Sequence, residues 1–390
     1  MNPDDPLSAA CSPDPYPYYA SLRAQESLLW NEKHALWVAS RACDMEEILH
    51  SPHCAVRPPA QSMPPSLAGG SAAQVFAGLM RMNEGAAHSK PKHVFHHALD
   101  KSDLQQLAGI TGQLCRTLAP DDVSISGQAL TQFTHILPVS AIARLLGFSD
   151  RQAMTAAALI ADFVRCLSAL STPAQLDAAH LAAQALQQNV AHLMETGDSP
   201  FLAALKAAAH DARWLDEAAI QTNLIGLLSQ TYEASAGLLG NCLIALRGHP
   251  DWRASLRNHP SHLEAWTEEV LRYDPPVQNT RRYIISDCHL AGRNLRRGDT
   301  ILLILAAANR DPAANRDPDR FDPERSPRRM LTFGSGHHLC PGQQLARSVC
   351  TTSLQYLLSH KGLRWDALRW TYQRSQNGRI PVFTHCQEHL

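Results

Sequence analysis

The pattern of hydrophobic and polar positions divides the chain into a long helical part and shorter segments that lack helical spacing. From about residue 72 to 272, alanine and leucine recur at helical spacing while glycine and proline are sparse, which predicts a series of helices. Within this part, residues 217–246 predict one helix of about 45 Å at ~1.5 Å per residue, buried because apolar residues occur on all its sides. Another helix is expected at about 342–359.

Short strands and irregular segments make up the rest of the pattern. Apolar runs bounded by turn residues predict strands at 36–39, 283–285 and 301–304, and a short strand-like end closes the chain. Irregular structure is expected at 1–19, 56–70 and 311–330, which are rich in proline or glycine. The predicted fold class is mainly α with a minor β region, in a single domain over residues 1–390, although length alone allows two or three domains.

Composition and charge exclude several classes of protein. Lys and Arg number 35 and Asp and Glu 36, so the net charge is −1 and the chain lacks the basic field that nucleic-acid binding requires. The ten cysteines include no C-x-x-C pair, which disfavours a zinc ribbon. The N-terminus lacks the apolar segment of a signal peptide, and no apolar run of about 20 residues could span a bilayer. We therefore expect a soluble, cytoplasmic protein that binds neither nucleic acid nor membrane.

The sharpest chemical feature is the glycine-rich stretch F-G-S-G-H-H-L-C-P-G at residues 333–342. Its glycines allow tight turns and let the backbone approach a flat ligand without Cβ clashes. Cys340 stands just before the helix expected at 342–359, where backbone N–H groups and the helix dipole favour a thiolate. Such a thiolate suits an axial iron ligand. The alternative is that Cys340 is a small buried hydrophobe, the usual fate of a lone cysteine.

The spacing F-G-x-G-x-H-x-C-x-G resembles the haem-ligand signature of the cytochrome P450 family, and every specified position is filled. The resemblance covers most of the chain and is densest from about 217 to 383. It implies the cytochrome P450 fold, a triangular helical prism with a long central helix over the haem. It also implies haem b as the cofactor, with Cys340 as the axial ligand of the iron. The other motif residues implied to contact the cofactor are Phe333, Gly334, Gly336 and Gly342.

Two further groups of residues match the family. Glu269 and Arg272 lie at the i,i+3 spacing that brings two side chains to one helix face, and they resemble the E-x-x-R motif, which implies a structural role. Haem propionates need cationic or hydrogen-bonding partners. The partners implied by the resemblance are His338, Arg282, His88 and Lys92. Lys92 stands where the family's H-x-x-x-R motif has arginine, and a lysine lacks the bidentate geometry of arginine.

The long helix departs from the family at its oxygen-activating motif. Residues 230–235 align with A-G-x-[DE]-T-[TS], so the resemblance assigns proton delivery to Glu233, while Ala234 replaces the usual threonine. Ser235 or Thr231 could supply the missing hydroxyl. Alternatively, a hydroxyl on the substrate supplies it together with a bound water, since some macrolide-hydroxylating members carry the same Glu-Ala-Ser sequence. A third explanation is a reaction other than ordinary hydroxylation. We favour the hydroxyl supplied by the substrate.

The resemblance also implies a substrate pocket and redox partners. The pocket residues are expected to include Gln230, Val277, Gln278, Asn279 and Asn377. Polar side chains placed there would bind an oxygenated or amide-bearing molecule, or they bond to one another and to water. Electrons are expected from a separate ferredoxin and ferredoxin reductase.

The sequence therefore predicts a monooxygenase that inserts one oxygen atom from O2 into a small organic substrate, in the tailoring of a secondary metabolite. One alternative uses the same haem for peroxide-driven oxidation, desaturation or oxidative coupling. Another, from a different class, is a non-catalytic haem-binding or gas-binding protein.

Overall fold

The computed structural model describes residues 3, 5–25, 27–59, 61, 63–120, 123–168 and 170–385. The segments 1–19 and 56–70, for which irregular structure is predicted, therefore fall partly outside the described residues.

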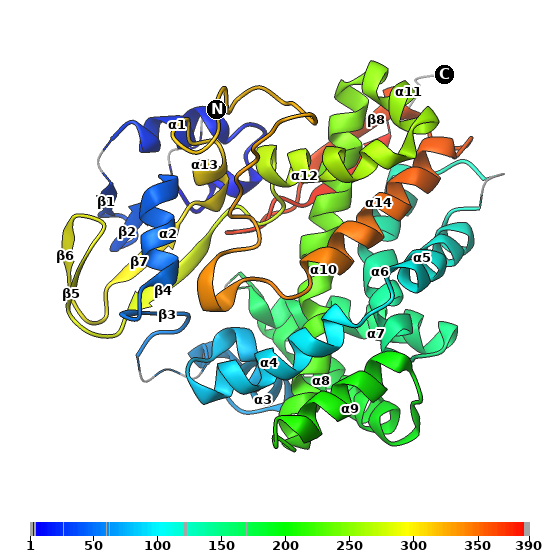
Figure 1. Ribbon diagram of the computed structural model, residues 1–390, viewed down its shortest axis with the longest axis horizontal. Coiled ribbons are helices and arrows are strands. Elements are labelled where there is room, and N and C mark those ends of the chain that lie inside the picture. The colour runs from blue at the N-terminus through cyan, green and yellow to red at the C-terminus, as the bar shows by residue number, and fades with distance from the viewer. Residues whose placement is uncertain are drawn as a thin grey trace.

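Helices form most of the described chain (Figure 1). The α-helices are α1 Tyr16–Arg23, α2 Ala42–His50, α3 Ser71–Gly78, α4 Ala86–Asp100, α5 Leu104–Leu118, α6 Gly127–Leu146, α7 Asp150–Phe163, α8 Pro173–Thr196, α9 Pro200–Asp211, α10 Glu217–Gly248, α11 Pro250–Asn258, α12 Leu263–Tyr273, α13 Leu305–Asn309 and α14 Gln343–Ser359. Short 3₁₀ helices join them: η1 Ala9–Cys11, η2 Pro65–Leu67, η3 Met80–Met82, η4 Val164–Leu167, η5 Pro260–His262, η6 Gly336–His338 and η7 Trp365–Ala367.

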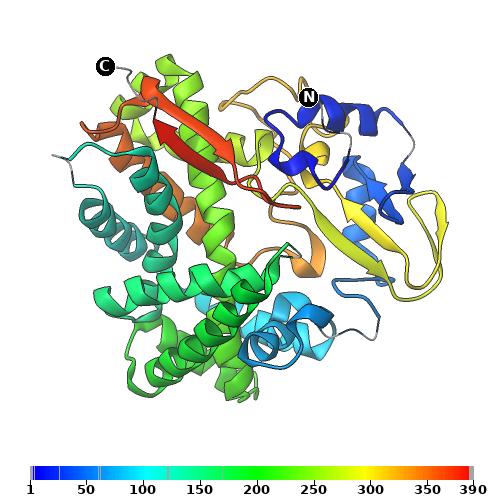
Figure 2. The same ribbon diagram turned by 180° about the vertical axis from the view of Figure 1, so that it is seen from behind.

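The strands form one five-stranded sheet and two hairpins. The sheet has the order β1-β2-β7-β4-β3, from β1 Leu28–Asn31, β2 Leu36–Ala39, β7 Thr300–Leu303, β4 Thr280–Ile284 and β3 Cys54–Ala55. Its strands are antiparallel except for the parallel pair β2 and β7. The hairpins pair β5 Cys288–Leu290 with β6 Arg293–Leu295, and β8 Leu368–Tyr372 with β9 Pro381–His385. The second hairpin packs against α6 and α10 on the helical side, as the view from behind shows (Figure 2).

The long helix α10 runs through the middle of the helical part, with α6, α7, α8, α12 and α14 packed around it (Figure 1). It begins where the Asp216 side chain accepts the Ala219 N–H at 3.0 Å, and Glu217 complements the positive end of the helix dipole. Two hydrophobic clusters fill the interior. One lies among the helices from α3 to α12 and α14, and the other between the five-stranded sheet and α1, α2 and α13.

The predicted fold class, mainly α with minor sheets, is confirmed. The structure also confirms the long helix, the helix that ends at Ser359, and the strands near 36, 283 and 301. Strand β1 and helix α13 were not predicted. The irregular start expected for residues 1–19 is wrong from Tyr16 onward, because Pro15 sets the helical backbone and the Asp14 carboxylate accepts the Tyr16 N–H at 3.1 Å.

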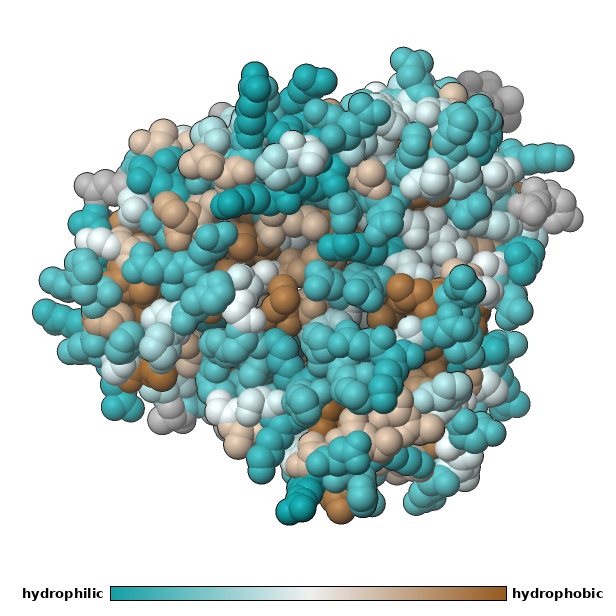
Figure 3. Space-filling model, in the orientation of Figure 1, coloured by the Kyte–Doolittle hydropathy of each residue, from teal (hydrophilic) through white to brown (hydrophobic). Residues whose placement is uncertain are grey.

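One helix of the described residues, α6, is long and apolar enough to cross a membrane. Of its most apolar window, 72% is buried inside the protein, and α6 packs against α5, α7 and α10. These contacts account for its composition as a core helix. The face seen in Figure 3 is largely hydrophilic, with separate apolar patches between the polar side chains.

Candidate functional site

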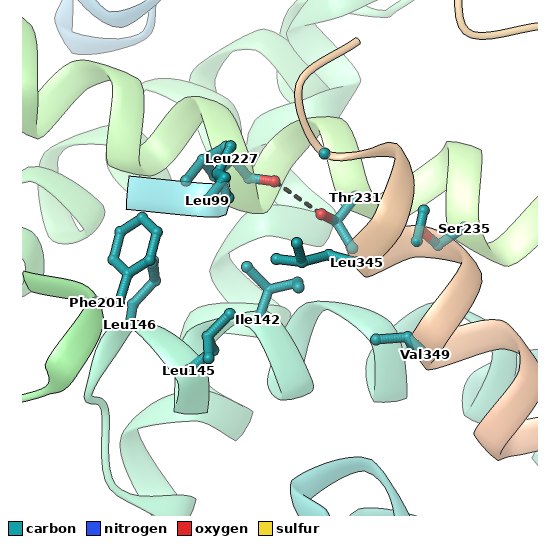
Figure 4. A pocket seen from close by; sticks show the side chains of 12 residues that line it. Leu99, Ile142, Leu145, Leu146, Phe201, Leu227, Thr231, Ser235, Leu345 and Val349 are labelled. Carbon is teal, nitrogen blue, oxygen red and sulfur yellow. Dashed lines mark hydrogen bonds between the residues drawn. The ribbon is translucent and has the colours of Figure 1, made fainter. Parts of the chain in front are cut away.

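The middle of α10 borders a hollow inside the protein. Residues 223–226 and 235–243 are buried, whereas Gln230 is exposed and residues 231–234 are half-buried. Helices surround α10, so side chains that regain accessible surface halfway along it face an internal space. A narrow cavity of ≈ 50 Å³ lies beside this stretch, between α10, α6 and α14 (Figure 4). Thr231, Ser235 and Gly342 are among its lining residues.

The cysteine loop closes this region from the other side. In both ribbon views, the orange segment before α14 lies between the sheet and α10 (Figures 1 and 2). Gly334 and Gly336 have φ angles of 75° and 67°, a backbone region that suits glycine. The Cys340 N–H donates to the Phe333 carbonyl at 2.9 Å, which closes the loop. A Cβ atom on Gly342 would meet nothing within 4 Å, so open space lies directly beside the loop.

Cys340 is half-buried as a residue. The Gly342 N–H and the Lys92 ammonium both lower the pKa of this thiol, but burial outweighs them and raises the pKa. The contribution that the sequence predicts from the helix start is therefore present, in the Gly342 N–H, but burial opposes it. Burial in a poorly polar environment disfavours the charged form, and metal coordination is what deprotonates such a thiol.

A cluster of imidazole and guanidinium groups lies beside the loop. The rings of His88 and His338 are 4.0 Å apart between centroids. Both nitrogens of His88 face carbonyl oxygens at 2.9 Å, those of Met80 and His337. Arg282 is buried, and the one hydrogen bond found for its guanidinium within the described chain goes to the Arg281 carbonyl, at 2.9 Å. The Arg282 guanidinium therefore has further N–H donors for which no described residue is an acceptor.

Glu84 belongs to this cluster and was missed by the sequence analysis. Its carboxylate lies 3.2 Å from His338 Nε2 and 3.3 Å from His337 Nε2, and it accepts the Val56 N–H at 2.9 Å. Although burial opposes it, the His338 contact is among the interactions that lower the pKa of Glu84 to about 2. Burial is the main cause that lowers the pKa of His338 to about 4.

Glu84, His337 and His338 could also hold a metal ion, since their ligand atoms lie within 4.8 Å of one another. However, the charge on Arg282 interacts with Glu84. A neighbouring guanidinium opposes a second cation at this position. The cluster is therefore better suited to an anion than to a metal ion.

Lys92 contacts the cysteine loop itself. Its ammonium donates to the carbonyls of His337 and, at 2.9 Å, of Leu339, and burial lowers its pKa. Lys92 therefore positions the backbone on either side of His338.

Glu269 and Arg272 are fully buried and form a bidentate ion pair. Arg272 Nη2 and Nε donate to Glu269 Oε1 and Oε2 at 2.7 and 3.0 Å. The same guanidinium donates to three backbone carbonyls, those of Asn309, Pro318 and Arg320. Because these carbonyls lie in the segment that leads to the cysteine loop, the pair holds that segment against α12.

The residues of the oxygen-activating motif lie on different sides of α10. Thr231 and Ser235 point toward α14, and the Thr231 hydroxyl donates to the Leu227 carbonyl at 2.8 Å (Figure 4). Ser235 is buried. Ala234 is half-buried, about 100° around the helix from Ser235. Burial raises the pKa of Glu233, and its one side-chain partner within the described chain is Gln373 Nε2, at 3.5 Å.

Two of the expected pocket residues are used inside the fold. Gln278 and Asn279 are buried, and their amides donate to the carbonyls of Pro275 and Gln376 at 2.7 and 2.8 Å. These bonds go to backbone carbonyls, not to one another, and Gln278 Oε1 is buried without a partner among the described residues. Val277 forms an isolated β-bridge with Gly378, and Asn377 is exposed beside it. Gln230 is the expected pocket residue that borders the hollow.

Comparison with known proteins identifies the family. The sequence profile of the cytochrome P450 family matches residues 177–360. A cytochrome P450-type protein of Xylella fastidiosa (133B2) is 30% identical over 96% of this chain and 96% of its own length. The chain belongs to the cytochrome P450 family. Cytochrome P450 107B1 of Saccharopolyspora erythraea is 33% identical over 65% of this chain, a match that spans 64% of that protein. The crystal structure of CalO2 superimposes with a TM-score of 0.82 and 25% identity, covering 99% of both chains.

Cytochrome P450s carry haem held by a cysteine thiolate and act as monooxygenases, so this chain is a haem enzyme of that type. The residues present fit the cofactor. The narrow cavity of Figure 4 is smaller than a macrocycle, but a Cβ on Gly342 would meet nothing within 4 Å, and residues 230–234 of α10 are not fully buried. The Cys340 thiol offers a ligand, and Arg282 offers buried donors for a carboxylate.

Proposed function

We propose that this cytochrome P450 inserts one oxygen atom from O2 into a small organic substrate bound in the hollow over the middle of α10, as a tailoring step of secondary metabolism. Cys340 would be the axial ligand, and His338, Arg282 and His88 would hold the propionates. When bound, the haem supplies dioxygen reduction and cleavage, which electron donation from sulfur favours. One observation carries the proposal: Gly342 of the cysteine loop and Thr231 of α10 line a common cavity (Figure 4).

The test is product analysis with isotopically labelled O2, a ferredoxin and a ferredoxin reductase. Incorporation of one labelled atom supports the proposal. Products without labelled oxygen, or turnover by peroxide alone, would replace it with desaturation, coupling or a peroxide-driven reaction. A protein that binds haem but turns over no compound that shifts its absorbance spectrum would be a binding protein.

Glu233 is proposed to hold the proton that the reaction consumes. Its carboxyl lies beside the hollow without a cationic partner among the described residues, and Gln373 is its one hydrogen-bond donor there. A raised pKa keeps a larger fraction of the carboxyl protonated near neutral pH, as a proton donor requires.

We expect Glu233→Gln to lower turnover by about 10²-fold or more, the usual contribution of a positioned acid. Glu233→Gln is also expected to raise the free energy of unfolding at neutral pH. Because the folded pKa of Glu233 is raised, the folded state binds its proton more strongly than the unfolded state, and the free energy of unfolding falls as pH rises between the two values. Turnover and urea unfolding measured at several pH values check both effects. Glu217→Gln, at the exposed start of the same helix, is the control and should change neither by much. Undiminished turnover in Glu233→Gln would remove this role.

The substrate is proposed to supply the hydroxyl that Ala234 lacks. Of the two candidate side chains nearby, the Thr231 hydroxyl donates within its own helix and Ser235 is buried toward α14. Both hydroxyls therefore lie on a different side of α10 from the side chain of residue 234.

Ala234→Thr is therefore expected to leave haem binding intact and to lower coupled product formation by about tenfold, because a new side chain would displace the substrate hydroxyl. The measurement is product formed per reducing equivalent consumed. Ala245→Thr, about three turns further along the helix, is the control. Faster and better-coupled turnover in Ala234→Thr would show that the substrate does not supply this hydroxyl, and would contradict the proposal.

Electrons are proposed to come from a separate ferredoxin and its reductase in the cytoplasm, and the ferredoxin is proposed to dock on the face that carries the cysteine loop. Leu339, next to Cys340, is 38% exposed, and Lys90, His93 and Arg329 are exposed. Arg328 and Arg347 both donate to Glu268 at 2.7 Å, which offsets part of their charge. Docking would thus rely mainly on Lys90 and Arg329.

A further inference from the structure

Arg81 lies on η3, the short helix held against the first half of α10. The Met80 N–H donates to Asn223 Oδ1 of α10 at 2.8 Å, and Asn83 Nδ2 donates to the Ala77 and Leu79 carbonyls at 2.8 Å. Leu79 covers Gly226 so closely that a Cβ there would approach it to 2.9 Å. Gly226 precedes Gln230 by one turn. The segment that carries Arg81 is thus fixed beside the hollow.

Within the described residues, the guanidinium of Arg81 has no counter-charge. Throughout the part of the chain that the structure describes, Arg81 takes part in no ion pair, and its Nε is buried without a hydrogen-bond partner. Two other buried arginines have a carboxylate partner, since Arg272 pairs with Glu269 and Arg379 with Asp274. Burial lowers the pKa of Arg81 to about 10, and the one titratable neighbour that acts on it is the Cys166 thiol, whose pKa burial raises to about 12. A neutral thiol does not balance a cation.

Arg81 also stands apart from the charges of the cluster formed by Glu84, His88, His338 and Arg282. Glu84, three residues further along, acts on Arg57 and Arg282, but Arg81 responds to Cys166 on η4, at the end of α7. Arg81 nevertheless keeps part of its surface accessible. Arg81 thus combines a buried Nε that has no hydrogen-bond partner with some accessible surface, and no described residue pairs with its charge. An unpaired charge at such a depth is costly unless something completes the pair.

We propose that Arg81 binds a carboxylate of the substrate, so that this cytochrome P450 acts on an organic acid held by its acid end between η3 and η4 with its carbon chain toward Gln230. The proposal rests on the proposed function, since it names the substrate class of the same hollow. An arginine presents two parallel N–H donors that match a carboxylate. The second possible source of a carboxylate is a haem propionate, and the experiment separates the two.

The test uses the haem-loaded protein and absorbance titrations with a series of straight-chain fatty acids, each compared with its methyl ester. Wild type is expected to bind at least one acid about tenfold more tightly than its ester, the usual effect of a charged hydrogen bond. Arg81→Gln should lose that preference while binding of the ester stays unchanged, and Arg81→Lys should retain part of it. Arg297→Gln, which removes the same charge from an exposed turn, should behave like wild type.

Haem transfer to apomyoglobin is measured on the same variants. Unchanged haem retention in Arg81→Gln supports the substrate site. Faster haem loss with the acid preference intact would make Arg81 a propionate partner and overturn the proposal. Equal binding of acid and ester by wild type, or no binding of any acid, would also overturn it. Failure of the proposed function is distinguishable, because it would appear as a ferrous–CO spectrum without thiolate character in wild type.

Discussion

Cys340→Ser is expected to abolish the thiolate-type ferrous–CO spectrum of the reconstituted protein and to reduce monooxygenase turnover to background. The serine hydroxyl is nearly isosteric but is a weak donor to iron, so it does not supply the electron donation that favours O–O cleavage. The surrounding cluster of His88, His338 and Arg282 is untouched by this change. We therefore expect haem to bind still, with altered spectra, so that loss of the ligand can be told apart from loss of the cofactor.

Cys43→Ser is the matched control, because Cys43 is the exposed cysteine of the described residues and lies on α2. It should leave the ferrous–CO spectrum and turnover unchanged. A thiolate-type spectrum that survives in Cys340→Ser would mean that another cysteine holds the iron, and the assignment of the site would be wrong.

The parts of this site that the sequence predicted are those encoded in short spacings. The glycines of the cysteine loop, the i,i+3 pair Glu269 and Arg272, and the long helix with Glu233 all depend on residues that are neighbours in the chain. Helical periodicity and turn chemistry are local rules, so a single sequence carries them. The structure agrees with each at the level of geometry.

Contacts between distant segments explain what the sequence did not predict. Glu84 has no motif around it, and only the fold brings it to His337 and His338, more than 250 residues away. Gln278 and Asn279 resemble pocket residues by position, but the fold bonds them to neighbouring carbonyls.

The electrostatics of the site likewise depend on three-dimensional burial. The helix start predicts a thiolate at Cys340, whereas desolvation by the surrounding structure raises the pKa. Whether an arginine such as Arg81 is paired also depends on every element that packs around it. Neither the pKa of Cys340 nor the pairing of Arg81 could therefore be predicted from the sequence.

The second large effect concerns the buried network beneath the cysteine loop. Glu269 Oε1 accepts the Asp322 N–H at 2.9 Å in addition to Arg272, and Glu269 Oε2 accepts Arg328 Nε at 3.1 Å. Removing one member leaves the others charged or unpaired in the interior. A buried ion pair is weak evidence for net stability, but breaking one by deleting a partner is strongly destabilising.

Arg272→Ala is accordingly expected to lower the free energy of unfolding by about 3–5 kcal/mol, measured by urea denaturation of the haem-loaded protein. Arg272→Lys keeps the charge but cannot reach both carboxylate oxygens and the carbonyls of Asn309, Pro318 and Arg320 together. It should therefore lose less stability than Arg272→Ala, and it provides the measurement if the alanine variant does not fold. Arg316→Ala removes an arginine whose side chain is 95% exposed and should change stability by less than about 0.5 kcal/mol. If Arg272→Lys were as stable as wild type, the role of the pair would be reduced to charge alone. Because the carbonyls that Arg272 binds belong to the segment leading to Cys340, faster haem release should accompany the lost stability, which joins the structural pair to the site that it supports.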